Sequence, residues 1–384
     1  MKNLKYIKFS QPLIEQKEIS EVIKTLKSGW LTTGNKTKIF EKNFLKYKNA
    51  KYAVALNSCT AAIHLSLMCL SLKPEDEVIT SALTFCSTVN SIIHAGGRPI
   101  LADVEWDTQN IDPKDIEKKI TKKTKAILVV HFGGRPCKMT EIMKIAKKNK
   151  LIVIEDCAHA IETKYKGKHV GNFGDFGCFS FYATKNLVTG EGGMLITKNK
   201  KYFNKIKILS LHGMDKAAWK RYGKLGYRHY DVSEIGFKYN MMDLQAAIGI
   251  HQLNRIEKNH KKRKKIFNTY KKNLKSLNII LPNAIDKNIK HSYHLFTLLI
   301  NKKINGINRD EFMLKMHKHR IGVGIHYRSI PEHSIYRKKF GWKLKNYPNS
   351  KKIGQETVSI PLSPALSKIE INKIIKSIKQ IIKN

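Results

Sequence analysis

Short apolar runs alternate with helical patterns over the first half of the chain. Seven runs rich in β-branched residues are predicted to be strands, at 51–57, 76–82, 98–104, 125–131, 151–157, 177–183 and 193–198. Apolar positions at helical spacing occupy the segments between them, such as those that follow Asn57 and Cys137. This alternation is typical of βαβ units, and strands apolar on both faces indicate a parallel sheet covered by helices.

The pattern changes after Asn240. A long amphipathic helix is predicted from Met242 to Leu274, because apolar positions recur there at helical spacing. Further strands are predicted at 294–300 and 322–328, with helices between and after them. We therefore expect an α/β protein with a large domain at 1–250, built on a mostly parallel sheet, and a smaller C-terminal α+β domain at 251–384. A chain of 384 residues exceeds the size at which one core keeps growing.

Apolar runs and cysteine spacing argue against a membrane protein, a secreted protein and a metal-binding protein. No apolar run reaches the eighteen or so residues of a membrane span, and charges interrupt the N-terminal segment where a signal peptide needs an apolar run. We expect a cytoplasmic protein without membrane insertion. The six cysteines lie in apolar segments without CxxC pairs, so they are expected to be structural, and no metal site is expected.

The net charge is strongly positive. The 72 Lys and Arg residues against 30 Asp and Glu give +42, an excess that nucleic-acid-binding proteins also show. The lysines are spread along the whole chain, and Lys far outnumbers Arg, whereas recognition of phosphates and bases favours Arg with interleaved aromatics. We favour a solvated surface that attracts anionic substrates such as a nucleotide diphosphate. A basic nucleic-acid-binding regulator is the alternative from a different class.

Charged residues follow one predicted strand in the segment IEDCAHA. The strand ends at Glu155 and Asp156, and His159 comes in the next turn. Ligands gather at the carboxyl ends of strands in open α/β sheets, so a carboxylate here is suited to a metal, a ribose or a cationic ring nitrogen. A helix N-cap aspartate explains the same pattern equally well.

A lysine lies among apolar residues in the segment SFYATKNLVTGEGG. Lys185 is flanked by aromatic and aliphatic residues, and Ser180 precedes it by five residues at the end of a predicted strand. Burial lowers the pKa of a lysine, and Schiff-base chemistry requires the neutral amine. Most lysines of this chain are surface residues, which is the alternative interpretation of Lys185.

A third segment, LNSCTAAIHL, turns from a strand through Ser58, Cys59 and Thr60 into a predicted helix. Backbone N–H groups and hydroxyls at a helix N-terminus form a ready phosphate site. An ordinary N-cap accounts for the same residues.

Along the chain, a phosphate-binding turn at 58–60 is followed by Asp156 on a strand and then by Lys185 with Ser180 upstream, and this order resembles that of fold-type I pyridoxal enzymes. From about residue 8 to the end, the chain resembles the DegT/DnrJ/EryC1/StrS family of sugar aminotransferases. The resemblance includes SGWLTTG (28–34), the DEVIT and LTFCST run (76–88), EDCAHA (155–160), SFYATKN (180–186), GEGGM (190–194), LHGM (211–214), GFKYNMMDLQAAIG (236–249) and GIHYRS (324–329). Within the family, the SGWLTTG, TKYKGKHVG, GFKYNMMD and HYR segments are most similar to the 4-aminotransferases, including the 4-amino-4-deoxy-arabinose enzyme.

The resemblance implies a fold-type I aminotransferase that binds pyridoxal 5'-phosphate. Lys185 would hold the cofactor covalently and then move a proton between the substrate carbon and the cofactor carbon. Asp156 would pair with the protonated pyridine nitrogen. His159 would lie near the phenolic oxygen of the cofactor, and Phe85 would stack on its ring.

The resemblance also implies how the cofactor phosphate is held. Cys59, Thr60 and Ser180 would bind it, and Asn240 with Lys238 would reach it from a second subunit, which implies a homodimer with shared active sites. Many relatives carry Gly-Thr in place of Cys59–Thr60, and Asn and Arg at positions 238 and 240. Which of Lys238 and Asn240 meets the phosphate therefore stays open.

Substrate contacts are expected by analogy from two loops. The candidates are Thr32, Thr33, Gly34, His326, Tyr327 and Arg328. For His326, a packed histidine without a functional role is the alternative.

The implied reaction moves an amino group from L-glutamate to a 4-keto sugar carried on a nucleotide diphosphate, with UDP as the expected nucleotide, for surface polysaccharide or lipid modification. The enzymatic alternative is 3-amination of a dTDP-3-keto-6-deoxyhexose. The family's 3-dehydratases have histidine at the position of Lys185, which argues against that reaction.

Overall fold

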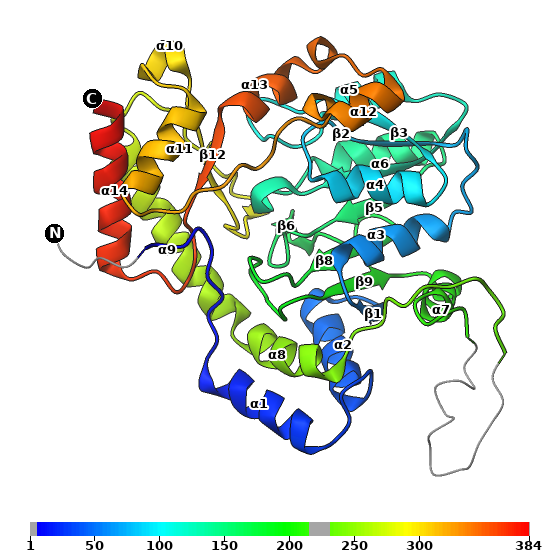
Figure 1. Ribbon diagram of the computed structural model, residues 1–384. Helices are drawn as coiled ribbons and strands as arrows, with labels where there is room; N and C mark the ends of the chain where they lie inside the picture. Colours follow the sequence, from blue (N-terminus) through cyan, green and yellow to red (C-terminus); the bar gives the residue numbers. More distant parts are fainter. Residues whose placement is uncertain (1–5, 215–230, 384) are drawn as a thin grey trace.

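The structure, a computed structural model, describes residues 6–214 and 231–383. Two lobes lie side by side in Figure 1. The large lobe surrounds a seven-stranded sheet, and the small lobe is formed by helices and a short sheet near the C-terminus. The α/β class expected from the sequence, with a mostly parallel sheet and a smaller C-terminal part, is confirmed.

The large sheet has the strand order β1-β9-β8-β5-β4-β2-β3. Its strands are β1 (Tyr52–Leu56), β2 (Glu77–Ser81), β3 (Arg98–Ala102), β4 (Thr124–Val130), β5 (Ile152–Asp156), β8 (Phe176–Ser180) and β9 (Gly193–Thr197). Strand β9 pairs antiparallel with both neighbours, whereas the other pairings are parallel. All seven strands expected in this region are present, so the mostly parallel sheet is confirmed.

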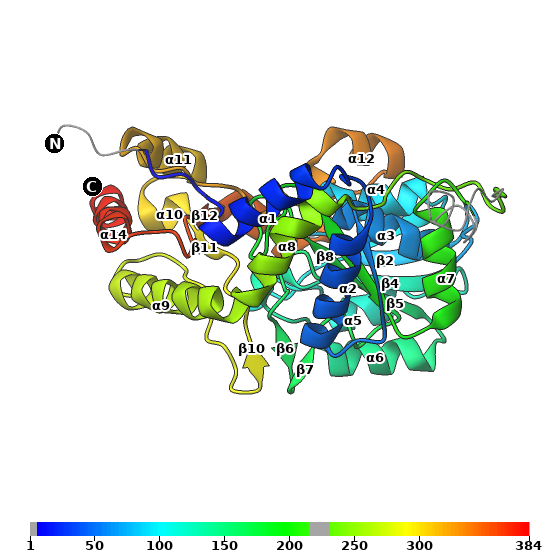
Figure 2. The same cartoon turned by 90° about the horizontal axis from the view of Figure 1, so that it is seen from below.

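Helices cover both faces of this sheet. They are α1 (Gln16–Lys27), α2 (Asn35–Lys48), α3 (Cys59–Met68), α4 (Cys86–His94), α5 (Pro113–Lys119), α6 (Met139–Lys148), α7 (Lys200–Leu209) and α8 (Asp243–Asn254). Successive strand residues face opposite sides, so Leu128 of β4 packs in the core of α3 and α7, while Val129 packs with α5 and α6. Helices α2 and α8 lie side by side in Figure 2, and their buried side chains pack with those of β1 and β9.

The small lobe has its own core. This core is formed by residues of α9 (Ile256–Leu274), α11 (Arg309–Lys318), α14 (Lys368–Lys383), β11 (Phe296–Leu299) and β12 (Thr357–Ile360). Three further helices lie outside it, α10 (Lys302–Asn305), α12 (Ser334–Phe340) and α13 (Pro348–Glu356). Strands β6 (Lys164–Tyr165), β7 (Lys168–His169) and β10 (Ile289–Lys290) form a separate small sheet.

Two segments cross between the lobes. Ile7, at the start of the chain, is buried in the small-lobe core and pairs with Ile321. In the other direction, Ile330 and Tyr336 pack against Leu101 of the large sheet, so the segment around α12 lies on the large lobe (Figure 1). The division at residue 250 stays a prediction.

Two local predictions were wrong. Residues 322–328 form no strand: Gly324 makes a single bridge to Ser359, and the chain continues irregularly to Arg328. The predicted helix from Met242 to Leu274 is two helices, α8 and α9, that meet at Arg255. Arg255 leaves helical geometry (φ −109°, ψ 10°), and its guanidinium binds Glu18 and the carbonyl of Leu13.

Within the described ranges, no helix has both the length and the apolar character needed to cross a membrane.

Candidate active site

Strand β5 ends with two carboxylates that face opposite sides of the sheet. Glu155 is saturated: its oxygens accept the N–H groups of Gly171, Phe173 and Gly174 and a hydrogen bond from His131. Burial alone would raise the pKa of Glu155, but His131 and these N–H groups lower it. Glu155 is therefore a structural anion.

Asp156 faces the other side of the sheet, and fewer hydrogen bonds hold its carboxylate. One oxygen accepts the Ala158 N–H at 3.0 Å, and the other accepts the Thr88 hydroxyl at 3.3 Å. Burial raises the pKa of Asp156, against the opposing effects of the Ala158 N–H, Lys185, His131 and Thr88. A buried carboxylate with this spare capacity is suited to a cationic partner such as a protonated ring nitrogen.

Lys185 lies in the loop between β8 and β9. Its side chain is half-buried, and burial lowers its pKa from 10.5 to about 8, while Asp156 acts in the opposite direction. Among the residues that the structure describes, its amine makes no hydrogen bond. Desolvation thus produces what a Schiff-base lysine needs, an amine that is partly neutral near pH 8.

The N-terminus of α3 and the end of β8 lie close together. Ser180 pairs with Gly193 across β8 and β9, and a Cβ on Gly193 would lie 2.4–2.6 Å from the backbone of Ser58 and Cys59. The absent side chain therefore lets α3 begin directly against β9. The first N–H groups of a helix have no acceptor within it, so this corner offers donors suited to a phosphate.

The three predicted phosphate residues differ in what they can offer. Thr60 is exposed, and Ser180 is partly exposed with its hydroxyl 3.4 Å from the Tyr182 N–H. The Cys59 thiol is buried, and burial raises its pKa well above the ordinary value. Cys59 can therefore contribute its backbone N–H rather than a thiolate.

Phe85, His159 and Tyr327 form an aromatic group beside Asp156. The ring of Tyr327 is stacked on His159 with centroids 6.0 Å apart, and it is tilted against Phe85 at 5.8 Å. Phe85 is 56% exposed although it is apolar. An exposed aromatic face next to a buried carboxylate is suited to covering a flat ring.

His159 has both ring nitrogens in hydrogen bonds. Nδ1 lies 3.2 Å from the Gly133 N–H, and Nε2 lies 3.0 Å from the Tyr327 hydroxyl. Burial lowers the pKa of His159 well below its ordinary value, and Lys185, His294 and His326 act in the same direction. The neutral imidazole is therefore the stable form.

A network of polar residues near Lys185 was not predicted from the sequence. Arg263 binds Glu162, Glu162 accepts the Asn186 amide at 3.0 Å, and the Asn186 oxygen lies 3.0 Å from Nδ1 of His294. The His294 ring is 4.3 Å from that of His159. Asn186 adjoins Lys185 in the sequence, and this position is the one signal that could have indicated the network.

His326 and Arg328 occupy different surroundings. His326 lies 2.9 Å from the Ser359 hydroxyl and stacks on Phe9, and burial, with Lys185, lowers its pKa to about 3. Arg328 is exposed and pairs with Glu332. It lines an open pocket together with Arg309 and Arg337, and no hydrogen bond or ion pair joins it to the described residues around Lys185.

The predicted TTG residues and Asn240 form a second group. The Asn240 amide donates to the Thr33 hydroxyl at 2.7 Å, and this hydroxyl donates to the Met241 carbonyl at 2.5 Å. Thr32 is exposed, and its carbonyl accepts the Asp243 N–H at 3.1 Å.

Asp243 fixes the position of this loop. Its carboxylate accepts the N–H groups of Gly34, Lys36 and Thr37 and the Thr37 hydroxyl. Asp243, at the start of α8, therefore caps α2 from more than 200 positions away in the sequence.

This second group lines a large pocket of about 770 Å³. Thr33, Gly34 and Asn240 lie in its wall with Trp30 and Glu41, whereas Lys185 and Asp156 do not. Lys238, two positions before Asn240 in the sequence, is exposed. Its partial burial lowers the pKa of its ammonium group. Within one subunit, Lys238 and Asn240 flank the strand end that leads into α3, because Asn57 donates to the carbonyls of Tyr239 at 2.7 Å and Lys238 at 3.2 Å, but this pocket includes neither Lys185 nor Asp156.

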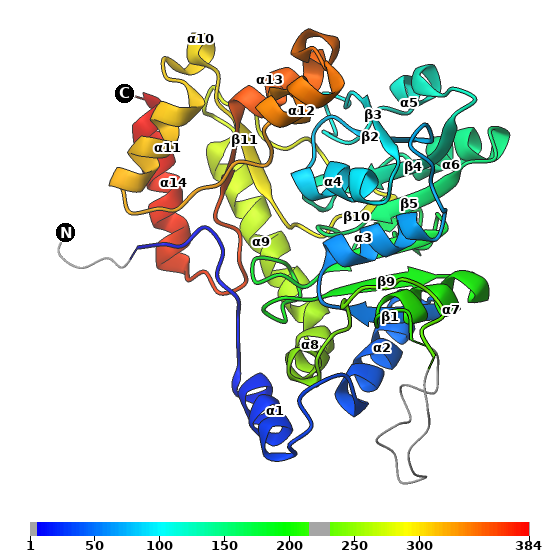
Figure 3. The same ribbon diagram turned by 45° about the vertical axis from the view of Figure 1, so that its right-hand side comes forward.

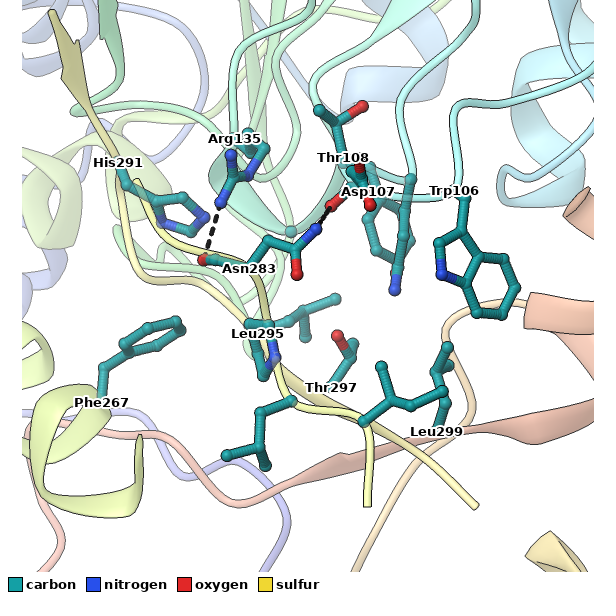
Figure 4. A pocket seen from close by; sticks show the side chains of 16 residues that line it. Trp106, Asp107, Thr108, Arg135, Phe267, Asn283, His291, Leu295, Thr297 and Leu299 are labelled. Atoms are coloured by element: carbon teal, nitrogen blue, oxygen red, sulfur yellow. Dashed lines mark hydrogen bonds between the residues drawn. The ribbon is translucent and has the colours of Figure 1, made fainter. Parts of the chain in front are cut away.

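Two other features do not match the expected chemistry. The cavity in Figure 4 lies between the lobes and contains Arg135, whose guanidinium donates to the carbonyls of Asn283 and Ala284. Its volume of about 50 Å³ is too small for a nucleotide sugar. The buried group of His131, Glu155 and Cys157 has metal-ligand types, but Glu155 is already saturated by hydrogen bonds.

The family follows from comparison with known sequences. The model of the DegT/DnrJ/EryC1/StrS aminotransferase family matches residues 12–379. The chain belongs to this family. This aminotransferase is 44% identical over 379 residues to the spore coat polysaccharide biosynthesis protein SpsC of Bacillus subtilis, a match that covers 98% of this chain and 97% of SpsC.

Solved structures agree with this membership. Spr1654 of Streptococcus pneumoniae in its PMP form has a TM-score of 0.92 and 32% identity, covering 98% of this chain and 99% of that one. The same protein has also been solved in a PLP form. PseC of Helicobacter pylori, an aminotransferase involved in the biosynthesis of pseudoaminic acid, has a TM-score of 0.92 and 26% identity, covering 99% of this chain and 100% of PseC.

The residues of this aminotransferase fit pyridoxal phosphate. A half-buried lysine with a lowered pKa, a buried carboxylate, an exposed aromatic ring and a helix N-terminus meet where β5 and β8 end and α3 begins. When bound, the cofactor supplies an electron sink that stabilises negative charge on the substrate carbon.

Proposed function

We propose that this aminotransferase moves an amino group from L-glutamate to the C4 ketone of a nucleotide-linked sugar, with UDP as the nucleotide. The observation that supports transamination is the half-buried Lys185 amine, whose pKa is lowered to about 8 beside the buried Asp156. The sugar substrate is supported by membership of the family and by similarity to SpsC. The product would enter surface polysaccharide or lipid modification.

Each residue near Lys185 has a physical role in this proposal. Lys185 holds the cofactor and carries a proton to and from the substrate carbon, because its amine exchanges a proton near neutral pH. Asp156 keeps the ring nitrogen protonated, and Phe85 covers the ring. Ser180, Thr60 and the N–H group of Cys59 hold the phosphate.

We also propose a homodimer with shared sites. Helix α1 exposes three apolar side chains, Ile19, Ile23 and Leu26, and it lies at the edge of the large lobe, as Figures 1 and 3 both show. Trp30 and Leu31, which follow it, are also more than 40% exposed. A monomer rarely leaves such a surface in water, and a second copy of the chain is its proposed partner.

Hydrogen-bond chemistry favours Lys238 over Asn240 as the phosphate ligand from the partner subunit. The Asn240 amide donates one of its two N–H groups to Thr33, and its buried oxygen, which has no partner among the described residues, is an acceptor that a phosphate cannot satisfy. Lys238 offers an exposed ammonium group. Asn240 then positions Thr33, and the TTG loop serves the same site as Lys238.

Sugar and nucleotide contacts are proposed from Thr32, Thr33 and Gly34 and from His326, Tyr327 and Arg328. Arg328 is the most exposed of the second set and is suited to a phosphate or a carboxylate. A cytoplasmic location, the absence of a nucleic-acid partner and the domain division at residue 250 remain parts of this proposal.

Product analysis tests the reaction. The enzyme is incubated with L-glutamate and a panel of UDP-, dTDP- and GDP-linked 4-keto sugars together with a dTDP-3-keto-6-deoxyhexose, and products are identified by mass spectrometry. We expect an amino sugar from a UDP-linked 4-keto substrate, and none with Lys185→Ala. Amination only of the 3-keto sugar would replace the proposal by the 3-aminotransferase.

A further inference from the structure

The hydrogen bonds around His159 determine which nitrogen carries its proton. A backbone N–H can only donate, so Nδ1, which faces the Gly133 N–H at 3.2 Å, must be the unprotonated nitrogen. In a neutral imidazole the proton is then on Nε2. A charged imidazolium would bring two N–H donors together at Nδ1.

The surroundings of His159 favour this neutral form. The side chain is only 4% exposed, and burial lowers its pKa well below the ordinary value. Lys185, His294 and His326 are the charged or titratable groups that lower the pKa further. His294 donates from Nδ1 to the Asn186 oxygen, because the amide nitrogen of Asn186 already faces the acceptors Glu162 and Ser292.

The direction of the next hydrogen bond follows. Nε2–H of His159 donates to the Tyr327 oxygen at 3.0 Å, so the tyrosine hydroxyl accepts this bond and keeps its own hydrogen free. Among the described residues, no acceptor takes that hydrogen. Tyr327 is partly exposed and tilted against Phe85, and burial followed by Asp156 raises its pKa, which keeps the phenol protonated.

We infer that the Tyr327 hydroxyl donates a hydrogen bond to an oxygen of the ligand bound beside Lys185, and that His159 is a positioning residue that fixes the direction of this bond. The inference rests on the proposed function for the identity of the ligand. The acceptor is an anionic or carbonyl oxygen, either the phenolic oxygen of the cofactor or an oxygen of the sugar. His159 has no free nitrogen to bind the phenolic oxygen itself.

The tautomer is measurable without cofactor or substrate. In protein labelled with ¹⁵N-histidine, long-range proton–nitrogen spectra distinguish protonated from unprotonated ring nitrogens, and the spectrum of His159→Gln identifies the His159 signals. We expect an unprotonated Nδ1 and a protonated Nε2 at neutral pH. The opposite tautomer, or a charged ring, would overturn the inference whatever reaction the enzyme catalyses.

Ligand binding tests the donor. Tyr327→Phe is titrated with pyridoxal phosphate, and in its PMP-loaded form with UDP-glucose and dTDP-glucose. We expect binding of at least one of these ligands to weaken about tenfold or more, the scale for a lost hydrogen bond to a charged group. A loss for pyridoxal phosphate assigns the acceptor to the cofactor, and a loss for a sugar nucleotide assigns it to the substrate.

Tyr336→Phe is the matched control, because its hydroxyl donates to Asn90 in the packing around α12. It should bind all three ligands like the parent. Unchanged binding of all three by Tyr327→Phe would overturn the donor assignment.

Variants of His159 test the positioning role. The amide nitrogen of His159→Gln can still donate to Tyr327, whereas His159→Ala cannot. We expect the glutamine variant to bind ligand more nearly like the parent, and Tyr327→Phe to add little to the defect of His159→Ala. Equal defects in the two His159 variants, with an additive effect of Tyr327→Phe, would show that His159 contributes only packing. An enzyme that forms no amino sugar would refute the proposed function and leave the tautomer result standing.

Discussion

The amide of Asn240 donates a hydrogen bond of 2.7 Å to the hydroxyl of Thr33, although 207 positions separate the two residues. This bond joins the GFKYNMMD segment to the TTG loop, and in the proposed shared site both segments would serve the same active site. The pocket that Thr33 and Asn240 line does not include Lys185 of the same subunit. A shared site in a dimer would bring these groups together.

Mixing of two inactive variants tests the shared site. Lys185→Ala lacks the amine, and Lys238→Ala/Asn240→Ala lacks the contacts supplied to the partner. After random exchange of subunits in an equal mixture, about half of the dimers are hybrids, and each hybrid has one intact site of its two. We therefore expect about a quarter of the parental activity. Native mass spectrometry verifies the exchange. Verified hybrids without activity, together with normal cofactor affinity of the double variant, would contradict sharing.

The lowered pKa of Lys185 predicts how cofactor capture depends on pH. Only the neutral amine attacks the aldehyde of the cofactor, and with a pKa of about 8 the neutral fraction rises roughly tenfold between pH 7 and pH 9. The rate of capture by apoenzyme should follow this rise and level off above pH 9. Borohydride reduction and peptide mapping should place the label on Lys185. A rate that still rises steeply at pH 10 would indicate an ordinary surface amine.

The same pKa shift predicts a change in the stability of the apoprotein. The folded form binds the Lys185 proton less tightly than the unfolded chain, so this group destabilises the fold below pH 8 and ceases to do so as pH rises towards 10.5. Apo Lys185→Met should therefore be more stable than the parent at pH 7, with a difference that shrinks between pH 8 and pH 10.5. Urea unfolding at several pH values measures it, and a difference that grows with pH would have the wrong sign.

Asp156→Asn should keep the fold and lose most transamination. A neutral amide cannot hold the proton on the pyridine nitrogen, and we expect kcat to fall by about two orders of magnitude or more, the scale for removing one preorganised electrostatic contact. Turnover and the cofactor absorbance are compared with those of the parent and of Asp107→Asn, which changes an exposed carboxylate. Turnover near the parental rate would remove Asp156 from the site.

Gly193→Ala should disturb the phosphate corner. The added Cβ would lie 2.4–2.6 Å from the backbone of Ser58 and Cys59, so α3 must move. We expect a loss of about 1–3 kcal/mol in the free energy of unfolding. Weaker binding of pyridoxal phosphate should accompany it. In the control, Gly97→Ala, the close neighbour is the mobile end of Leu72. Equal cofactor affinity in both variants would show that α3 does not hold the phosphate.

Local pattern predicted much of the fold. The seven strands of the large sheet are apolar runs that any packing must bury, so Ile154 and Val129 could be placed from their neighbours alone. The failure at 322–328 has a tertiary cause: His326 and Tyr327 are bound by Ser359 and His159 instead of by a strand partner. The break at Arg255 likewise depends on Glu18, far away in the sequence.

Residues of the candidate site could be predicted where a side chain suited to the chemistry lies at or just after the end of a predicted strand. Asp156 ends β5 and Lys185 follows β8, two neighbouring parallel strands, so both reach the carboxyl edge of the sheet. Asp243 and His294 could not be found in this way, because their partners Thr37 and Asn186 lie in distant segments. Their roles follow from hydrogen bonds that only the folded chain shows.

The saturated carboxylate of Glu155 has a consequence for its neighbour. In a strand, a slip of one residue would exchange the faces of Glu155 and Asp156 and carry Glu155 towards Lys185. Four donors hold Glu155 on the opposite face, and a slip would leave all four without their acceptor in the protein interior. His131 and the 171–174 turn therefore fix the register of β5 in the sheet. Substitutions there should damage catalysis by misaligning Asp156, without touching the cofactor.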